Sequence, residues 1–270
     1  MSNGSSDAVR YRAPALDKGL DILELLAASS DGLTQAEIAK GLGRGPNEIY
    51  RMLDTLVRRG YVIRSVDGDR YYLSLRLLVL ADAHPPRRRL LDAAEGRMRV
   101  FVREAEQSIH LAVLEEGEVI ISSAFSAPGN WRLSLRTGSV IGLFNTGSGA
   151  VLAAFQRPEI RGRLMQEHRL VRGETAIPRK EFEPHLDRIR EAGFFCGASQ
   201  TAIGAVNISF PILDPFGNAI AALTCPYLRR IDNYAAPPQD DVLAILRDTA
   251  GEISGQVLGP PPDPGVGTDE

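Results

Sequence analysis

The sequence has few cysteines and no long hydrophobic run, and both absences narrow its class. Only Cys196 and Cys225 occur among 270 residues, too few for a disulfide framework, so we expect reduced thiols. No stretch approaches the roughly 18 apolar residues of a membrane span, and the beginning, MSNGSSDAVR, lacks the apolar segment of a secretory signal. We therefore expect a cytoplasmic protein without membrane contact. The four histidines and two cysteines show no metal-ligand spacing, and we expect neither metal nor cofactor.

The chain as a whole also lacks a net positive charge, because its net charge is −3. Its distribution is uneven, however. Residues 40–76 carry eight Lys or Arg against four Asp or Glu, and such a local excess displaces counterions from nucleic-acid phosphates. A solvated protein surface would carry the same charges. Charge alone therefore leaves both interpretations open.

The first quarter of the chain has the order of elements of a winged helix-turn-helix. Apolar residues from Leu16 to Ala27 keep helical spacing. Thr34 precedes Glu37 in a capping-box arrangement and opens a short helix over residues 35–41. After a Gly-rich turn, Pro46 opens a second helix with apolar residues at helical spacing. The spacing then changes to two on both sides of Asp67-Gly68-Asp69, which predicts a β-hairpin.

The remainder of the chain predicts a separate α+β domain. A helix over residues 74–83 ends at His84-Pro85-Pro86, which we take as the domain boundary, and Arg87 begins a second long helix. Strands are expected at 109–114, 118–124, 131–136, 205–213 and 219–225, and helices at 145–155, 159–170, 180–192 and 238–256. Hairpins of strands with helices packed to one side make an α+β fold with an antiparallel sheet.

Six segments of the sequence resemble regulators of the IclR family. They are RAPALDKGLDILELLA, GLTQAEIAKGLGRGPNEIYRMLDTLVRRGYV, RYYLSLRLL, GLFNTGSGAVLAAF, EAGFFCGASQ and ISFPILDPFGNAIAALT. The resemblance runs from about Ala13 to Val257 and implies a winged helix-turn-helix, a linker helix and a GAF-like effector-binding domain. Phe144 and Ala150 depart from the family pattern, which usually has His and Lys there.

Together these features predict five segments. A disordered arm (1–12) precedes the DNA-binding domain (13–75), a linker helix with its Pro break follows (76–89), then an effector-binding and oligomerisation domain (90–257) and a disordered tail (258–270).

The DNA-binding candidates lie at the beginnings of the two short helices and in the hairpin. Arg pairs with guanine, Asn with adenine and Glu with cytosine in the major groove, whereas helix N-termini hold phosphates. The alternative for Glu48 is a structural pair with Arg44 or Arg51, and a phosphate or minor-groove contact of Arg70 is equally open. The candidates are Thr34, Gln35, Arg44, Pro46, Asn47, Glu48, Tyr50, Arg51 and Arg70.

The effector candidates begin with a small-residue segment that precedes an apolar helix. Backbone N–H groups at the positive end of a helix form an anion site, which suits a carboxylate without any Lys. That segment comprises Phe144, Asn145, Thr146, Gly147, Ser148 and Gly149. The resemblance adds positions on the last two strands, namely Asn207, Ser209, Thr224 and Pro226. His110 shares a strand face with Ser108 and Ala112, where either a structural or a ligand-binding role is open.

These features predict a transcription regulator whose operator binding responds to a small organic acid. By resemblance we expect control of a catabolic operon, with repression favoured, a homodimer or a tetramer built from two dimers, and a palindromic double-stranded DNA operator. Two alternatives remain. In one the C-terminal domain only oligomerises, and in the other it is a small-molecule hydrolase. The sequence offers hydroxyls, amides and backbone donors rather than paired titratable groups, which favours binding over catalysis.

Overall fold

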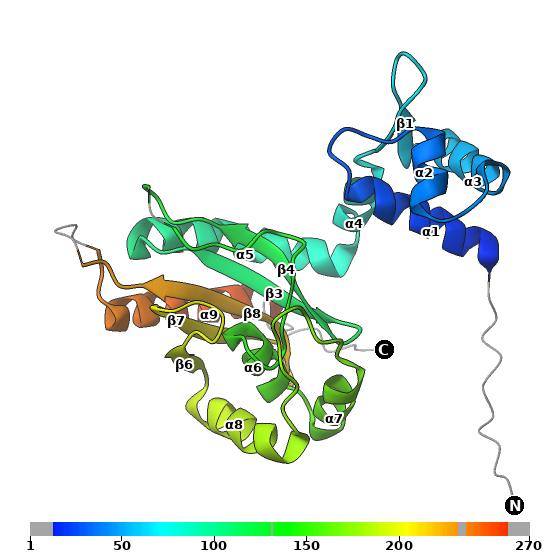
Figure 1. Ribbon diagram of the computed structural model, residues 1–270. Coiled ribbons are helices and arrows are strands. Elements are labelled where there is room, and N and C mark those ends of the chain that lie inside the picture. Colours follow the sequence, from blue (N-terminus) through cyan, green and yellow to red (C-terminus); the bar gives the residue numbers. More distant parts are fainter. Residues whose placement is uncertain (1–12, 131, 232–235, 259–270) are drawn as a thin grey trace, which may run out of the picture. The chain divides into compact units, whose positions relative to one another are not determined.

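The computed structural model describes residues 13–130, 132–231 and 236–258, in two compact units that divide after Arg87 (Figure 1). The expected arm over 1–12 and the expected tail beyond residue 258 lie outside the described residues. Each unit is described by itself below. In the described part of the chain, no helix is both long and apolar enough to cross a bilayer.

The first unit is a winged helix-turn-helix followed by one short helix, as the sequence predicted. It comprises α1 (Pro14–Ala27), α2 (Gln35–Gly41), α3 (Pro46–Arg58), β1 (Val62–Arg64), β2 (Tyr71–Leu73) and α4 (Arg76–Asp82). β1 and β2 pair antiparallel as the wing. The three long helices bury one apolar core between them, with Ile22, Ile38 and Ile49 fully enclosed. Burial of these side chains is the main stabilising contribution to this small unit.

Local sequence signals determine where α2 and α3 begin. The predicted capping box is present, because the Thr34 hydroxyl accepts from the N–H of Glu37 and the Glu37 carboxylate accepts from the N–H of Thr34. Pro46 occupies the first turn of α3, where a missing N–H costs nothing. Gly43 lies between the two helices with φ of +60°, a conformation that glycine adopts without steric cost. This turn fixes the angle between α2 and α3.

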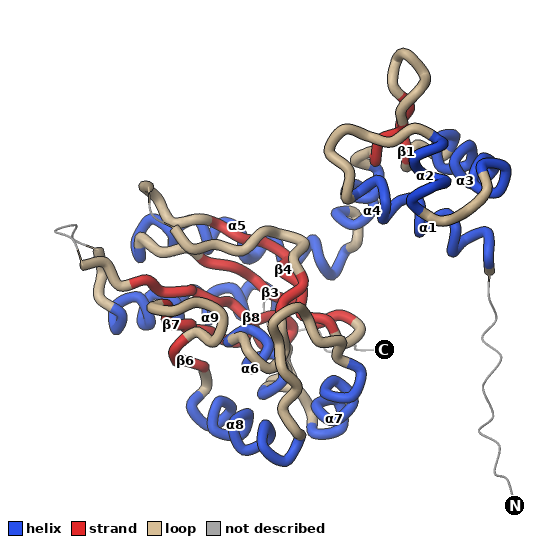
Figure 2. Tube along the Cα trace, viewed as in Figure 1, coloured by secondary structure: helices blue, strands red, loops and turns tan. Residues whose placement is uncertain are grey.

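The second unit is built on a six-stranded antiparallel sheet (Figure 2). Its strands are β3 (Ile109–Glu115), β4 (Glu118–Phe125), β5 (Val140–Ile141), β6 (Phe195–Ala198), β7 (Ala205–Leu213) and β8 (Ala219–Leu228), in the order β5-β4-β3-β8-β7-β6. Its helices are α5 (Pro85–Ala105), α6 (Gly147–Ala154), α7 (Pro158–Glu167), α8 (Arg179–Ala192) and α9 (Gln239–Leu258). The expected α+β class with an antiparallel sheet is confirmed.

The two faces of the sheet carry different cores. Side chains of β7 and β8 that point to one face of the sheet, such as Ile208, Phe210 and Leu223, pack with α5 and α9. The opposite face packs with α6, α7 and α8. Because successive strand residues point to opposite faces, polar residues such as Ser209 and Thr224 share the face that α6 covers.

The strand expected over residues 131–136 is wrong for its described part, because residues 132–136 belong to no strand. Their alternation has another cause, since Leu133 and Leu135 both line a pocket described below. Two other strands were not anticipated. They are the two-residue β5 and the edge strand β6, which contains Gly197 and pairs with β7, and short edge strands carry little periodicity.

Helix α6 is buried along its whole length between the sheet and α8. Its start comes close to the preceding backbone at Gly149. A Cβ on this residue would lie 2.4 Å from the Leu143 carbonyl oxygen and 2.7 Å from the Gly142 carbonyl oxygen. Backbone atoms cannot move aside as flexible side chains can. Glycine is therefore required here by space and not by its φ angle.

We expect Gly149→Ala to lower the free energy of unfolding by about 1–3 kcal/mol, because overpacking against backbone forces a shift of α6. The matched control is Gly251→Ala in α9, where a Cβ meets nothing within 4 Å and the change should be neutral or stabilising by up to about 1 kcal/mol. Chemical denaturation of both variants measures this. A Gly149→Ala protein as stable as wild type would contradict the prediction.

Candidate functional site

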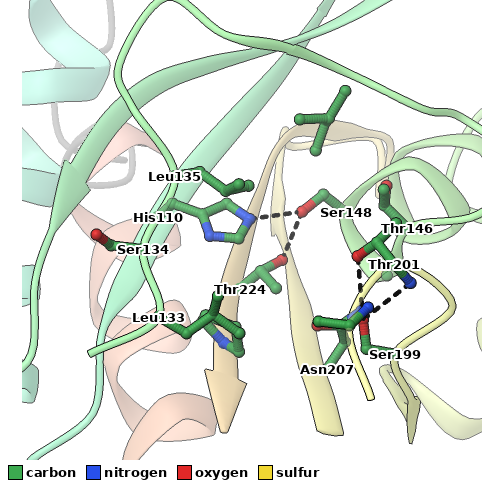
Figure 3. A pocket seen from close by; sticks show the side chains of 14 residues that line it. His110, Leu133, Ser134, Leu135, Thr146, Ser148, Ser199, Thr201, Asn207 and Thr224 are labelled. Carbon is green, nitrogen blue, oxygen red and sulfur yellow. Dashed lines mark hydrogen bonds between the residues drawn. The ribbon is translucent and has the colours of Figure 1, made fainter. Parts of the chain in front are cut away.

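A pocket of about 70 Å³, lined by both polar and apolar side chains, lies in the second unit, between the sheet face, the start of α6 and two loops (Figure 3). Such a volume holds several water molecules or one small organic molecule. Seven of the predicted effector residues line it: His110, Thr146, Gly147, Ser148, Asn207, Thr224 and Pro226. The remaining lining residues are Leu133, Ser134, Leu135, Ile141, Ser199, Thr201 and Ala202.

Four buried side chains form a hydrogen-bonded row, and three of them, His110, Ser148 and Thr224, make up the floor of this pocket (Figure 3). His110 and Ser209 are both cross-strand neighbours of Thr224, so β3, β8 and β7 each contribute one member. Ser148 joins the row from α6, with its Oγ 3.0 Å from His110 Nε2 and 2.8 Å from Thr224 Oγ1. The Thr224 hydroxyl in turn donates to Ser209 Oγ over 2.8 Å. The row ties α6 to three strands.

The direction of these hydrogen bonds indicates the state of His110. Since the Thr224 hydroxyl donates to Ser209, it accepts from Ser148, and the Ser148 oxygen then accepts from His110 Nε2–H. Burial lowers the pKa of His110 from 6.5 to about 4, because the charged imidazolium is disfavoured away from water. His110 is therefore neutral at physiological pH, which fits a hydrogen-bonding role.

The start of α6 leaves backbone donors without partners in residues that line the pocket. The Thr146 hydroxyl accepts from the N–H of Gly149 over 3.0 Å and donates to the Gly142 carbonyl over 2.6 Å. The N–H groups of Gly147 and Ser148 have no hydrogen-bond partner among the described residues, and both residues line the pocket. Two free donors at the positive end of a helix are suited to one carboxylate.

Four predicted effector residues do not line the pocket: Phe144, Asn145, Gly149 and Ser209. Gly149 lies under the backbone of Leu143, and Ser209 lies below Thr224 at the end of the row. The Phe144 ring packs edge-on against His168 and Phe182 in the core. These residues therefore support the pocket from behind.

A buried hydrogen-bonded pair, His168 and Glu174, holds the segment before α6. Glu174 accepts from the N–H of Phe144 over 2.7 Å and lies 2.8 Å from His168 Nε2, and both side chains of this pair are fully enclosed. His168 Nδ1 lies 2.8 Å from the Gly117 carbonyl. Burial by itself would raise the pKa of Glu174, but hydrogen bonds from Phe144, His168 and Val171 outweigh it and hold this pKa below its ordinary value.

Two loops supply six of the seven lining residues that sequence reasoning missed, and β5 supplies the seventh, Ile141. Leu133, Ser134 and Leu135 come from the segment first taken as a strand, and Ser199, Thr201 and Ala202 come from the turn between β6 and β7. Within that turn the hydroxyls of Ser199 and Thr201 lie 3.1 Å apart. A cluster of small polar residues between two strands was the available signal. It does not say which cavity a loop reaches.

Metal ligation finds no support in the part of the chain that the structure describes. No group of three or more His, Cys, Asp or Glu side chains gathers there in a way that could hold an ion.

Several DNA-binding candidates have internal partners in the first unit. Glu48 accepts from the Gly45 N–H at 3.1 Å and pairs with Lys18 at 3.0 Å, rather than with Arg44 or Arg51. The hydrogen bond from Lys18 is the main reason that the pKa of Glu48 lies below its ordinary value. These contacts correspond to the structural alternative for Glu48.

Three further candidates also contribute to the internal structure of this unit. Arg44 pairs with Asp21 of α1 at 3.3 Å. Arg70 donates to the Gly32 carbonyl at 2.9 Å and lies 3.6 Å from Glu37, so it ties the wing to the start of α2. Thr34 is engaged in the capping box.

Four of the five remaining DNA-binding candidates lie on α3 and present exposed side chains without a side-chain hydrogen bond among the described residues. Pro46, Asn47, Tyr50 and Arg51 are exposed, whereas Ile49 between them is buried in the core. The Gln35 amide donates to the Pro46 carbonyl over 3.4 Å and links α2 to α3. An exposed helix face that begins at a proline-opened N-terminus has the geometry of a helix that enters the major groove.

Both units match known protein families. Residues 15–65 match the IclR helix-turn-helix domain, and residues 86–255 match the bacterial transcriptional regulator IclR C-terminal domain. The chain is 27% identical over 262 residues to the HTH-type transcriptional regulator KdgR of Escherichia coli K12, covering 95% of this chain and 97% of KdgR.

Two further similar proteins concern 4-hydroxybenzoate or its metabolism. The p-hydroxybenzoate hydroxylase transcriptional activator of Acinetobacter baylyi is 25% identical over 261 residues, covering 92% of this chain and 94% of that protein. An IclR homologue from Microbacterium hydrocarbonoxydans, solved with 4-hydroxybenzoate, shares the fold with a TM-score of 0.72 at 23% identity, over 90% of this chain and 98% of that one.

The burial of His110 predicts a loss of stability in mild acid. Its folded pKa of about 4 lies below the ordinary 6.5, so the unfolded chain binds the proton first. The contribution is complete above pH 6.5 and is lost as the pH falls toward 4, which amounts to about 2 kcal/mol between pH 7 and pH 5. Chemical denaturation at both pH values should show this loss in wild type and not in His110→Gln.

The matched control is His84→Gln. Because His84 is exposed, this substitution should leave the wild-type pH dependence unchanged. Equal pH dependence of the free energy of unfolding in wild type and His110→Gln would contradict the assignment of this loss to His110.

Proposed function

Because the chain belongs to the IclR family of bacterial transcriptional regulators, we propose that it binds a specific operator through α3 and releases or engages it in response to a small organic acid. The pocket at the start of α6, with its hydrogen-bonded floor, is the observation that carries this proposal. It lies in a different unit from the helix-turn-helix, so ligand and DNA are separate partners of one chain. A ligand shifts DNA occupancy to the extent that its affinity differs between the two states.

A carboxylate is the ligand group that the pocket favours. Among the described residues, its lining includes no Asp, Glu, Lys or Arg, and His110 is neutral, so the free N–H groups of Gly147 and Ser148 are the electropositive feature of this described lining. Arg132 and Arg136 are exposed on either side of the lining segment 133–135. Positive charge beside the pocket raises the local concentration of anions. The hydroxyls of Ser199 and Thr201 can bind the rest of the molecule.

The pocket favours sensing over the two alternatives. A domain that serves only for oligomerisation needs no polar pocket. A hydrolase would need an activated nucleophile, and Ser148 does lie 3.0 Å from His110. With a pKa of about 4, however, His110 is a weak base at neutral pH. No carboxylate hydrogen-bonds to it in the described ranges, so the pair lacks the third member of a catalytic triad.

Self-association has support from α4, which buries none of its residues within the chain. Leu75, Leu78, Val79 and Leu80 are 76%, 59%, 56% and 57% exposed. Contiguous apolar surface of this kind is typical of an interface, and a two-fold operator calls for two copies of the DNA-binding unit. We therefore propose a homodimer, or a tetramer of two dimers, that works in the cytoplasm as a repressor of a catabolic operon. Sedimentation as a monomer at micromolar concentration would contradict this assembly.

Selection of DNA tests the proposal directly. The full chain should enrich a two-fold symmetric sequence from a pool of random duplexes. Arg51→Ala should weaken binding to that sequence by about 1–3 kcal/mol, because an exposed Arg on α3 pairs with guanine. Fluorescence anisotropy measures this. Arg103→Ala, which removes the same charge from an exposed position of α5, serves as the control. If both variants bind as wild type does, Arg51 has no part in recognition.

Thermal shift tests the ligand class. A panel of short and aromatic carboxylic acids should contain a member that raises the melting temperature of the full chain and alters operator binding. Asn207 lines the pocket with no side-chain hydrogen bond among the described residues, so Asn207→Ala should weaken that acid roughly three- to tenfold. Gln166→Ala, an exposed amide outside this pocket, is the control.

The matching primary amide of the acid should bind at least about tenfold more weakly, because it loses the charge that the helix N-terminus favours. Equal binding of acid and amide would contradict the carboxylate assignment.

A further inference from the structure

Five exposed side chains form one continuous stripe along α3, which we call the recognition stripe. Their spacing of three and four residues places them on one face of the helix. The stripe consists of Asn47, Tyr50, Arg51, Asp54 and Arg58. Ile49 and Leu53 are buried on the opposite face. In the described part of the chain, none of the five side chains makes a hydrogen bond or an ion pair with another residue.

Asp54 stands out because it is an acid among groups suited to DNA. Arg51 lies three residues before it and Arg58 four residues after it, positions that face each other along a helix. Asp54 nevertheless forms an ion pair with neither of them, although pairs at the same spacing do form in α5 and α8. Its carboxylate is thus available to a partner outside the chain.

A free carboxylate on a DNA-binding face is unfavourable beside phosphates, because like charges repel. The major groove offers it one compensating contact, the amino group of a base. Cytosine presents N4–H₂ there, whereas guanine presents only acceptors, thymine an acceptor with its methyl group, and adenine an acceptor beside its amino group. An acceptor with no donor of its own therefore discriminates in favour of cytosine.

Resting on the proposed operator binding, we propose that Asp54 is a specificity-determining residue that selects cytosine at one position of each half-site. Its carboxylate accepts a hydrogen bond from cytosine N4 and rejects the acceptor edges of guanine and thymine. Arg51 and Arg58 on either side of it offset the charge and contact guanine or phosphate. The sequence predicts DNA contacts in the first turns of α3, and this inference extends them to the middle of the helix.

The experiment compares the DNA sequences that full-chain variants select from a pool of random duplexes. Wild type should select cytosine at one position of each half-site, and another base there should weaken its binding roughly 5- to 150-fold. Asp54→Asn should shift the preference at that position toward adenine, which Asn recognises through N6 and N7. Asp54→Ala should reduce the discrimination to within about twofold.

The control is Glu24→Gln, which removes one negative charge from an exposed position of α1 and should keep the wild-type preference. Circular dichroism of each variant establishes that the helices form. If the Asp54 variants bind every duplex more tightly with an unchanged base preference, Asp54 only repels phosphates and the inference is overturned. If wild type selects no sequence at all, the proposed operator binding itself fails, which is a different result.

Discussion

The packing of α6 against the sheet of the second unit depends on a row of buried polar side chains. Apolar residues at these positions would need no hydrogen-bond partners. His110, Ser148, Thr224 and Ser209 are all buried, and an unsatisfied polar group there would cost about 1–3 kcal/mol. Each satisfies its neighbour, so the row is stable only when α6 and three strands are in register. The strands carry the row on the face that α6 covers, beside the apolar core of that face, which leaves a polar floor beneath the pocket.

In the first unit, charged side chains likewise pair with one another and hold elements together. Glu48 and Arg44 were predicted as DNA contacts from the sequence, yet Glu48 ties α3 to Lys18 of α1, and Arg44 ties the turn before α3 to Asp21 of α1. Exposed pairs of this kind contribute little stability individually. Their effect is to fix the orientation of α3 and to engage charges that would otherwise compete for phosphates. The residues left free on α3 are the ones that spacing assigns to the recognition stripe.

Elements with strong periodicity could be predicted from the sequence, and elements that depend on distant partners could not. The helices of the first unit and the strands β7 and β8 were placed correctly because their apolar spacing and caps are local signals. The separation of Thr146, Gly147 and Ser148 from Phe144 and Gly149 was not predictable, because it depends on which side of α6 meets the pocket. Nor was the part played by Leu133 and Leu135, whose alternation resembled a strand.

The floor of the pocket tolerates few substitutions, whereas the loops that form its walls tolerate more. Its floor belongs to strands and to α6, where a substitution breaks buried hydrogen bonds or meets backbone, as at Gly149. Leu133, Leu135, Ser199 and Thr201 belong to loops at the surface, where substitutions are tolerated. A pocket built in this way can change its shape and chemistry through a few loop mutations while the fold stays intact. The same division makes the loops the place to randomise when binding of a new small molecule is to be engineered.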